Sequence, residues 1–187
     1  VGVYDNGGMG LDGNHKKIIL NTNVAYNVVP QGRYGGGMSA SANTDSVLIM
    51  NSIFYGNGTD VTDTDGHRGV VINGPKLAAF NSYFKPENGP GGNPELDPER
   101  GADNIFSDVN PFNGYALANY SDAIAAGKPS IQFDGETISA PSKDYYGNDR
   151  PVPTGTNPDM GAVENVLSSP RYNKYTVTKD GSGNFSS

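Results

Sequence analysis

One short segment concentrates the carboxylates that could bind a metal ion. Asp60, Asp63 and Asp65 lie in the run DVTDTDGHR at residues 60–68. In an extended chain Asp63 and Asp65 point the same way, and carboxylate oxygens are the ligands that calcium prefers. The spacing is not that of an EF-hand, and a solvated Asp/Thr/Gly turn is the alternative interpretation. The sequence therefore predicts a weak calcium site at Asp60, Asp63 and Asp65.

Arg68 ends the same segment and is the candidate catalytic residue, as a base. A basic side chain can act as a base when its surroundings lower its pKa toward the working pH. Lys76 and Lys85 are the alternatives, although each adjoins a proline in an expected turn, where solvent-facing lysines are common. His15 and His67 lack a metal-ligand spacing, and no Ser/His/Asp order stands out. The absence of Cys excludes thiolate zinc sites and cysteine nucleophiles.

Net charge limits the partners that this chain can have. The formal charge of the 187 residues is −7, whereas nucleic-acid surfaces need clustered Lys and Arg. The longest apolar run is much shorter than the roughly 20 residues that a membrane-spanning helix needs. We therefore expect no nucleic-acid partner and no membrane span.

The abundance of turn-forming residues predicts an all-β chain. Gly occurs 26 times and Pro 13 times, and only 18% of the residues are charged, which is unfavourable for long surface helices. Asn, Asp, Gly, Ser and Thr recur every few residues and break the chain into short strands. Disorder is the alternative, but eleven Tyr, seven Phe and several aliphatic runs argue against it.

A repeat of thirty residues organises the first half of the chain. The segments 18–24, 48–54 and 78–84 align without gaps, and each carries an Asn followed by Thr or Ser, at Asn21, Asn51 and Asn81. A second set of aligned residues, Met9, Met38 and Val70, has spacings of 29 and 32. Short strands repeated in this way predict stacked coils of a β-solenoid.

The three asparagines are interpreted as structural residues of that stack. Equivalent side chains of stacked coils lie above one another, so Asn21, Asn51 and Asn81 can form a ladder of amide hydrogen bonds. Residues 3–6 resemble residues 54–57, so the sequence begins partway round a coil. An open strand edge invites pairing, and we expect upstream β-helix coils or a second chain to cover this N-terminal end.

Four motifs of the second half carry a family resemblance. They are FNGYAL at 112–117, SDAIAAG at 121–127, DYYGNDRP at 144–151 and DMGAVE at 159–164. In this order they resemble the C-terminal part of bacterial pectate-lyase-like proteins, which are right-handed parallel β-helices with coils of roughly 30 residues. The chain departs from the family pattern at Asp122 (usually Pro), Ala125 (usually Asp) and Met160 (usually Ile).

The resemblance covers roughly residues 1–167 and has implications for function. It implies a bacterial protein that is secreted or at the cell surface and that acts on or binds pectic polysaccharide, a plant-type acidic polymer. Pectate lyases remove a proton next to a carboxylate, with calcium to neutralise the substrate, which gives Arg68 and the calcium candidates their expected roles. The polar residues of the closing motifs, by contrast, are expected to be structural and to close the last coil: Asp144, Arg150, Asp159 and Glu164.

A second resemblance lies at the end of the sequence. Residues 175–187, YTVTKDGSGNFSS, resemble the first strand and turn of a pectin methylesterase domain, and Ser168–Pro170 would be a linker. The expected organisation is therefore β-helix coils at 1–88, further coils, loops and closing motifs of the same domain at 89–167, and at 168–187 a linker and strand beginning a following domain.

Two other functions are compatible with the same residues. The chain can be a structural or adhesive solenoid subunit that stacks into filaments, since a free strand can add to an exposed edge. It can also be a non-catalytic carbohydrate-binding solenoid. The closing motifs do not separate these from a lyase, because fold does not determine function.

Overall fold

The computed structural model describes residues 2–4, 9–11, 13, 15–29, 36–40, 46–59, 70–72, 76–84, 90–91, 101–107 and 109–172. These ranges contain strands and turns and no helix, which confirms the all-β prediction. The described part of the chain accordingly offers no helix that could cross a membrane.

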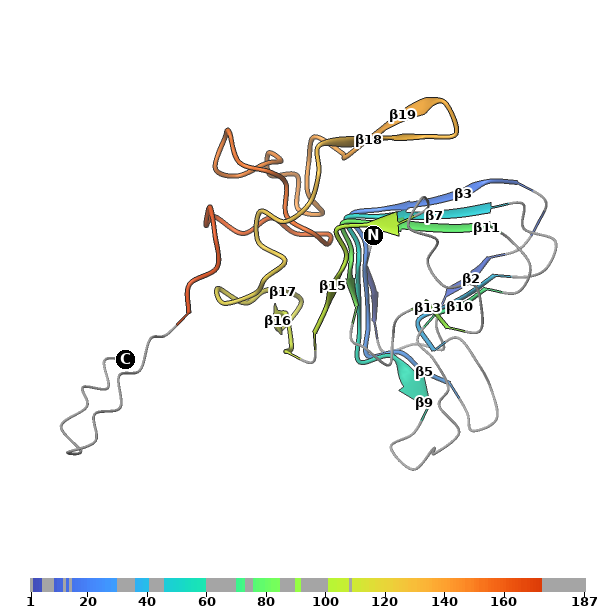
Figure 1. Ribbon diagram of the computed structural model, residues 1–187. Helices are drawn as coiled ribbons and strands as arrows, with labels where there is room; N and C mark the ends of the chain where they lie inside the picture. Colours follow the sequence, from blue (N-terminus) through green and yellow to red (C-terminus); the bar gives the residue numbers. More distant parts are fainter. Residues whose placement is uncertain are drawn as a thin grey trace, which may run out of the picture.

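Parallel strands form three sheets around one core (Figure 1). Sheet A contains, in order, β1 (Gly2–Tyr4), β4 (Asn23–Ala25), β8 (Ile53–Tyr55), β12 (Tyr83–Phe84) and β15 (Ile105–Phe106). Sheet B contains β2 (Met9–Leu11), β6 (Met38–Ala40), β10 (Val70–Ile72) and β13 (Pro90–Gly91). Sheet C contains β3 (Lys17–Leu20), β7 (Ser46–Met50), β11 (Lys76–Phe80) and β14 (Gly101–Ala102). A short parallel pair, β5 (Val28–Val29) with β9 (Gly58–Thr59), lies beside them.

The strand registers confirm the alignment of the repeat. Lys17 pairs with Val47 in sheet C, and Val47 pairs with Leu77, so each step advances thirty residues. In sheet B, Met38 lies between Met9 and Val70, as the second set of aligned residues predicted. After Phe84, β13, β14 and β15 add one further layer within the residues expected to hold further coils and loops.

The inner core is built from one side of each strand. Ile19, Ile49 and Ala79 contribute from successive strands of sheet C, and Phe54 and Phe84 from sheet A. The rings of Phe54 and Phe84 are stacked with their centroids 5.5 Å apart. Equivalent positions of successive repeats therefore bury equivalent side chains, which explains why the apolar pattern recurs every thirty residues.

A sharp corner joins sheet C to sheet A in every repeat. Asn21, Asn51 and Asn81 stand at this corner with φ values of 45°, 49° and 46°. These lie in the left-handed region, which Asn tolerates better than other residues with a Cβ. The next residue supplies a hydroxyl ladder between repeats: the Thr22 amide donates to Ser52 Oγ at 3.2 Å, and the Ser52 amide to Ser82 Oγ at 3.1 Å. Both residues of the Asn-Thr/Ser pair are thus explained by the corner.

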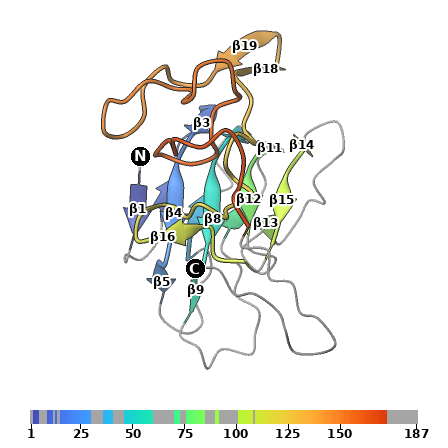
Figure 2. The ribbon, with the colours of Figure 1, turned by 90° about the vertical axis from the view of Figure 1, so that its left-hand side faces the viewer.

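The C-terminal segment, residues 107–172, consists of turns and two antiparallel hairpins. Strand β16 (Phe112–Asn113) pairs with β17 (Ala116–Leu117), and β18 (Ser130–Phe133) pairs with β19 (Glu136–Ser139). The segment lies on the outer side of sheets A and C (Figures 1 and 2). It covers sheet A through a second apolar cluster, formed mainly by Ala25, Ile53, Tyr83, Phe112, Leu117, Ala123, Ile124 and Met160.

The outer face of sheet C is covered at β7, whereas Ile18 of β3, which pairs with Leu48 on this face, is 41% exposed. Leu48 and Met50 alternate along β7 with the core residues Val47 and Ile49, yet they are fully buried as well. Lys16, just before β3, donates to Glu136 Oε2 at 2.7 Å and lies 5.8 Å from the centre of the Phe133 ring. The hairpin of β18 and β19 is thereby held beside the first strand of sheet C.

Candidate functional site

The corner asparagines are where the C-terminal segment is attached to the stacked strands. Asn21 Nδ2 donates to the Asp159 carbonyl at 3.1 Å, and Asn81 Nδ2 to the Ala126 carbonyl at 3.4 Å. Asn51 makes a reciprocal pair with Lys128: its Nδ2 donates to the Lys128 carbonyl at 2.8 Å, and its Oδ1 accepts from the Lys128 amide at 2.9 Å. All three asparagines are buried, so these bonds are shielded from water.

Two of the three side-chain amides, those of Asn21 and Asn51, also meet as the expected ladder requires, but at a long distance. Asn51 Nδ2 lies 3.4 Å from Asn21 Oδ1, longer than its bond to Lys128. Most hydrogen bonds of these side chains go to backbone groups of the C-terminal segment rather than to one another, because the corner faces that segment. A fuller amide ladder lies farther along sheet A, where buried Asn57 Oδ1 accepts from Asn27 Nδ2 at 2.9 Å and Asn57 Nδ2 donates to the Val24 carbonyl at 2.7 Å.

Two glycines allow the segment to approach the corner closely. A Cβ on Gly127 would lie 2.7 Å from the Pro158 carbonyl oxygen and 3.0 Å from Asn51 Cγ. A Cβ on Gly161 would lie 2.3 Å from Asn23 Oδ1, and Gly161 has a φ of 95°. Backbone therefore packs directly against the asparagine side chains, and a larger residue at either position has no room.

The most concentrated charge in the described residues is a buried group in the C-terminal segment. Arg150 Nη1 forms an ion pair with Glu164 Oε1 at 3.0 Å, and both side chains are 1% exposed. The same guanidinium donates to the carbonyls of Asp159 and Gly161, each at 3.1 Å. The Asp159 carbonyl also accepts from Asn21, so the group is linked to the first corner.

Two aspartates complete this group by binding backbone amides. Asp159 Oδ1 accepts from the Ala125 amide, and Asp159 Oδ2 from the Asn165 amide, both at 2.6 Å. Asp144 accepts from the amides of Tyr146 and Asn148 at 2.9 Å. Each carboxylate thus joins stretches of chain that have no regular secondary structure and would otherwise leave amides unpaired.

Burial governs the pKa values of this group. It raises the pKa of Asp159 to about 7, although the amides of Ala125 and Asn165 oppose the shift. Burial also raises the pKa of Glu164, against the opposing effect of Arg150, and it lowers the pKa of Arg150.

A raised carboxylate pKa is often found at catalytic sites, but the surroundings of this group point to another role. Asp159 is fully buried and the Arg150 side chain is 1% exposed, so a polymeric substrate cannot reach either side chain. Their hydrogen bonds run to backbone groups of the same segment. The group therefore acts as an internal clasp. The sequence suggested that these residues close the end of the stack, but they lie on one of its outer corners instead.

The residues predicted to do chemistry lie mostly outside the described part of the chain. Asp60, Asp63, Asp65 and Arg68 all fall there, as do Lys85 and His67. Lys76 begins β11, and His15 is exposed in a turn. The described residues contain no cluster of three or more His, Cys, Asp or Glu side chains that could hold a metal ion.

Sheet B differs from the other two sheets in its outer face. Met38 and Leu11 contribute to the inner core, so the central residues of β2 and β6, Gly10 and Ser39, point outward. Gly10 is exposed, and a Cβ built on it would meet no atom within 4 Å. The C-terminal segment lies on the far side of the stack (Figure 1). Among the described residues, the outer face of sheet B is thus exposed at Gly10 and carries the small side chain of Ser39.

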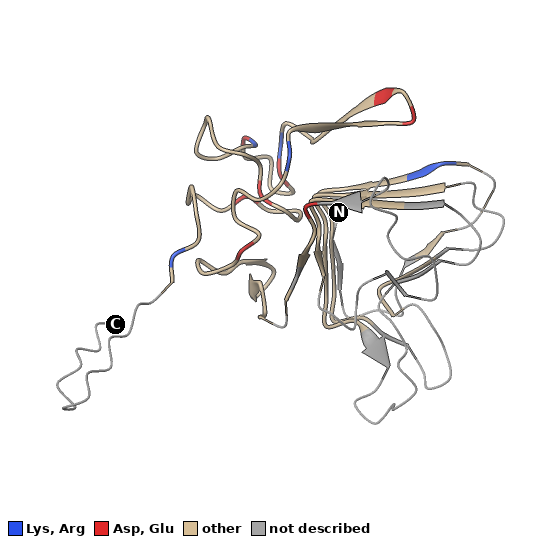
Figure 3. Ribbon diagram, in the orientation of Figure 1, with Lys and Arg blue, Asp and Glu red and all other residues tan. Residues whose placement is uncertain are grey.

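The strands of sheet B also carry no charged residue, and Figure 3 shows the described charges mainly in the C-terminal segment. A charged ligand on this face would depend on the loops that flank it. In the sequence, residues 60–69 connect β9 to β10, so the carboxylates and Arg68 precede a strand of this sheet.

Comparisons of the chain with protein-family models, curated proteins and solved structures give no match.

Proposed function

We propose that the chain is the C-terminal portion of a right-handed parallel β-helix that binds pectic polysaccharide along the outer face of sheet B. The observation that carries this proposal is the difference between the sheets. The C-terminal segment covers the outer face of sheet A, and Leu48 and Met50 on the outer face of sheet C are buried, whereas Gly10 of sheet B is exposed. Small residues such as Gly10 and Ser39 suit an extended polymer, because the polymer can lie close to the backbone.

The fold proposal is supported by the order and register of the strands. Three sheets receive one strand each from successive repeats, in chain order and in parallel, with steps of thirty residues in sheet C. The same arrangement accounts for the repeat and for the position of the closing motifs on the outside of the stack.

Charge determines which conditions binding requires. A chain with a formal charge of −7 repels a polyuronate, so a cation has to lie between them. The carboxylates of the loop before β10 would hold calcium, and Arg68 at its end would bind the uronate carboxylate. Binding should consequently depend on calcium and weaken as the salt concentration rises.

The test compares binding of polygalacturonate by the chain with and without calcium, by isothermal titration calorimetry. Ser39→Trp places a bulky ring on the outer face of sheet B and should abolish binding. Ser139→Trp places the same ring on exposed β19 and serves as the matched control, which should bind as the unmodified chain does. Equal binding by the two variants would contradict the proposed face.

A second set of variants tests the role of the loop. The Asp63→Asn, Asp65→Asn double variant should lose calcium-dependent heat, and Arg68→Ala should weaken polymer binding while leaving calcium binding intact. We expect no useful rate of cleavage by the 187-residue chain, because a lyase site draws subsites from several coils and positioning supplies much of any rate. Calcium-dependent release of unsaturated uronate, lost in Arg68→Ala, would instead establish a lyase.

A further inference from the structure

The first hairpin of the C-terminal segment carries an asparagine–glycine pair at its tip. Strands β16 and β17 have two residues each, and Gly114 and Tyr115 form the loop between them. Gly114 has a φ of 66°, which suits the first central position of a two-residue hairpin turn. Both residues of the pair, Asn113 and Gly114, are exposed. Neither the Asn113 side chain nor the Gly114 amide makes a hydrogen bond with another described residue.

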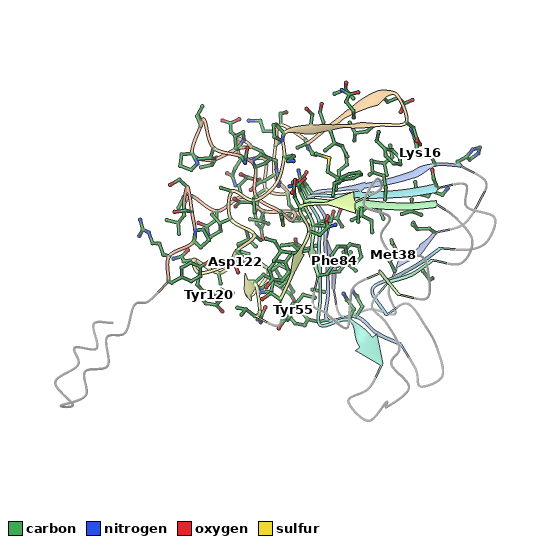
Figure 4. The ribbon with its side chains drawn as sticks, viewed as in Figure 1. Lys16, Met38, Tyr55, Phe84, Tyr120 and Asp122 are labelled. Carbon is green, nitrogen blue, oxygen red and sulfur yellow. The ribbon has the colours of Figure 1, made fainter. Side chains whose placement is uncertain are left out.

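The base of this hairpin is attached to sheet A, whereas its tip is not. The ring of Phe112 meets the ring of Tyr26 edge-on, with their centroids 6.2 Å apart, and Tyr26 meets Tyr55 in the same way at 6.3 Å. Figure 4 shows Tyr55 between sheet A and the C-terminal segment. Leu117, at the other side of the base, is 7% exposed. Strands this short contribute little stability of their own, so the tip can open while the base stays in place.

A second asparagine–glycine pair has the opposite environment. Asn57 is 3% exposed, and its Oδ1 accepts from both Asn27 Nδ2 and the Asn27 amide, at 2.9 and 3.1 Å. Asn57 Nδ2 donates to the Val24 carbonyl at 2.7 Å. Gly58 follows in β9, where it pairs with Val28. The fold therefore immobilises one of the two pairs and exposes the other.

We propose that Asn113 is a site of spontaneous modification, at which the side-chain amide is converted to aspartate and isoaspartate. The Gly114 backbone nitrogen loses its proton and bonds to Asn113 Cγ, the bond from Cγ to Nδ2 breaks, and ammonia leaves. Glycine favours this attack because it has no side chain to obstruct the approach. Water then opens the resulting succinimide ring. Cleavage between Cγ and the Gly114 nitrogen gives aspartate, and cleavage between that nitrogen and the main-chain carbonyl carbon of residue 113 gives isoaspartate.

The modification weakens the attachment of the C-terminal segment to sheet A. In isoaspartate the main chain runs through Cγ, which adds a backbone carbon at the position where Asn113 pairs with Ala116. The adjoining Tyr115 carbonyl accepts from Asn23 Nδ2 of β4 at 3.4 Å, and a displaced tip loses this bond. Both products also add a negative charge to a chain whose formal charge is already −7. The hairpin therefore loosens as the protein ages.

Mass spectrometry of the full 187-residue chain, stored in mildly alkaline buffer, tests the site. Trypsin releases residues 34–68 and 101–143 as separate peptides, and each holds one of the two pairs. We expect conversion at Asn113 to be at least tenfold faster than at Asn57. The reason is that three hydrogen bonds have to break at Asn57, and each lowers the reactive population by about fivefold. In urea the two asparagines should convert at similar rates, because unfolding removes those bonds.

Asn113→Gln is the matched control, because it keeps an exposed amide but would have to close a larger ring, which forms much more slowly. Residue 113 of this variant should stay unconverted, and thermal unfolding checks that the variant keeps the fold. Storage should make the unmodified chain more sensitive to protease within residues 107–172, and the variant should not change. The inference is overturned if Asn57 converts as fast as Asn113 in the folded chain, if the two rates differ as much in urea, or if storage sensitises the variant equally.

Discussion

Replacing Gly161 by alanine tests how the C-terminal segment is attached to the stacked strands. The new Cβ would lie 2.3 Å from Asn23 Oδ1 and 2.8 Å from Ile53 Cδ1. Asn23 cannot simply turn away, because its Oδ1 accepts the Ala162 amide at 3.0 Å, and Ile53 is fully buried. The stretch around Gly161 therefore has to withdraw from the corner.

The expected loss of stability follows from the contacts that such a withdrawal breaks. A residue with a Cβ at a φ of 95° costs about 1–2 kcal/mol in backbone strain. The Gly161 amide loses its 2.7 Å hydrogen bond to the Asn51 carbonyl, and the Ala162 amide loses its hydrogen bond to Asn23 Oδ1. Each lost bond lowers the free energy of unfolding by about 1 kcal/mol. Looser packing of the buried Met160 destabilises the variant further. We therefore expect Gly161→Ala to lower the free energy of unfolding by about 3–5 kcal/mol in total.

Gly155→Ala supplies the matched control. Gly155 has a φ of 91°, close to that of Gly161, but a Cβ there meets no atom within 4 Å. Its replacement should therefore cost only the backbone strain, about 1–2 kcal/mol. The difference between the two variants isolates the close approach at the corner.

Equilibrium unfolding in urea measures both variants, with a reduced midpoint as the expected outcome for Gly161→Ala. Limited proteolysis should also cut this variant faster within residues 107–172, because the segment detaches more often. If Gly161→Ala is no less stable than Gly155→Ala, the corner does not hold the segment and the reasoning is refuted.

Three further measurements test the clasp, the corner and the surface. Because burial raises the pKa of Asp159 to about 7, the folded protein keeps a proton that the unfolded chain has lost. The free energy of unfolding should fall by up to about 4 kcal/mol as pH rises from about 4 to about 7, and Asp159→Asn should flatten this fall in urea titrations at each pH. Asn51→Leu should cost about 1–3 kcal/mol by thermal unfolding, since both Lys128 backbone groups lose their partner; an unchanged midpoint would contradict this. Lys16→Met should change stability by less than about 1 kcal/mol, because its partner Glu136 is largely exposed, and a larger loss would show that the β18–β19 hairpin depends on it.

The buried clasp and the outer face of sheet B differ in chemistry and in exposure. Arg150 and Glu164 have perturbed pKa values but are enclosed, and they bind the backbone of their own segment. Gly10 and Ser39 have no such chemistry, yet they lie on the face that we propose for polymer binding. Exposure to solvent, rather than a perturbed pKa, is therefore the property on which we base the proposed ligand-binding face.

The sequence by itself determined the repeat, and hence the registers of the stacked strands. The thirty-residue spacing of Asn21, Asn51 and Asn81 predicts which strands pair, because each repeat buries the same side chains and turns at the same left-handed residue. These are local requirements of backbone conformation and alternation, so the residue pattern displays them directly. The thirty-residue period does not by itself give the registers of β13, β14 and β15, whose steps of 20 and 22 residues break it.

Only the tertiary structure decided which sheet faces are covered and what the corner amides bind. Asn21 meets the Asp159 carbonyl across 138 residues, and Asn51 meets Lys128 across 77. No periodicity links such positions, since the C-terminal segment has no repeat of its own. Its path is set by the apolar outer face of sheet A, by room for Gly127 and Gly161, and by buried amides that need partners. Those conditions exist only once the strands have stacked, which is why the sequence alone predicted a ladder and the folded chain uses the same asparagines as an attachment site.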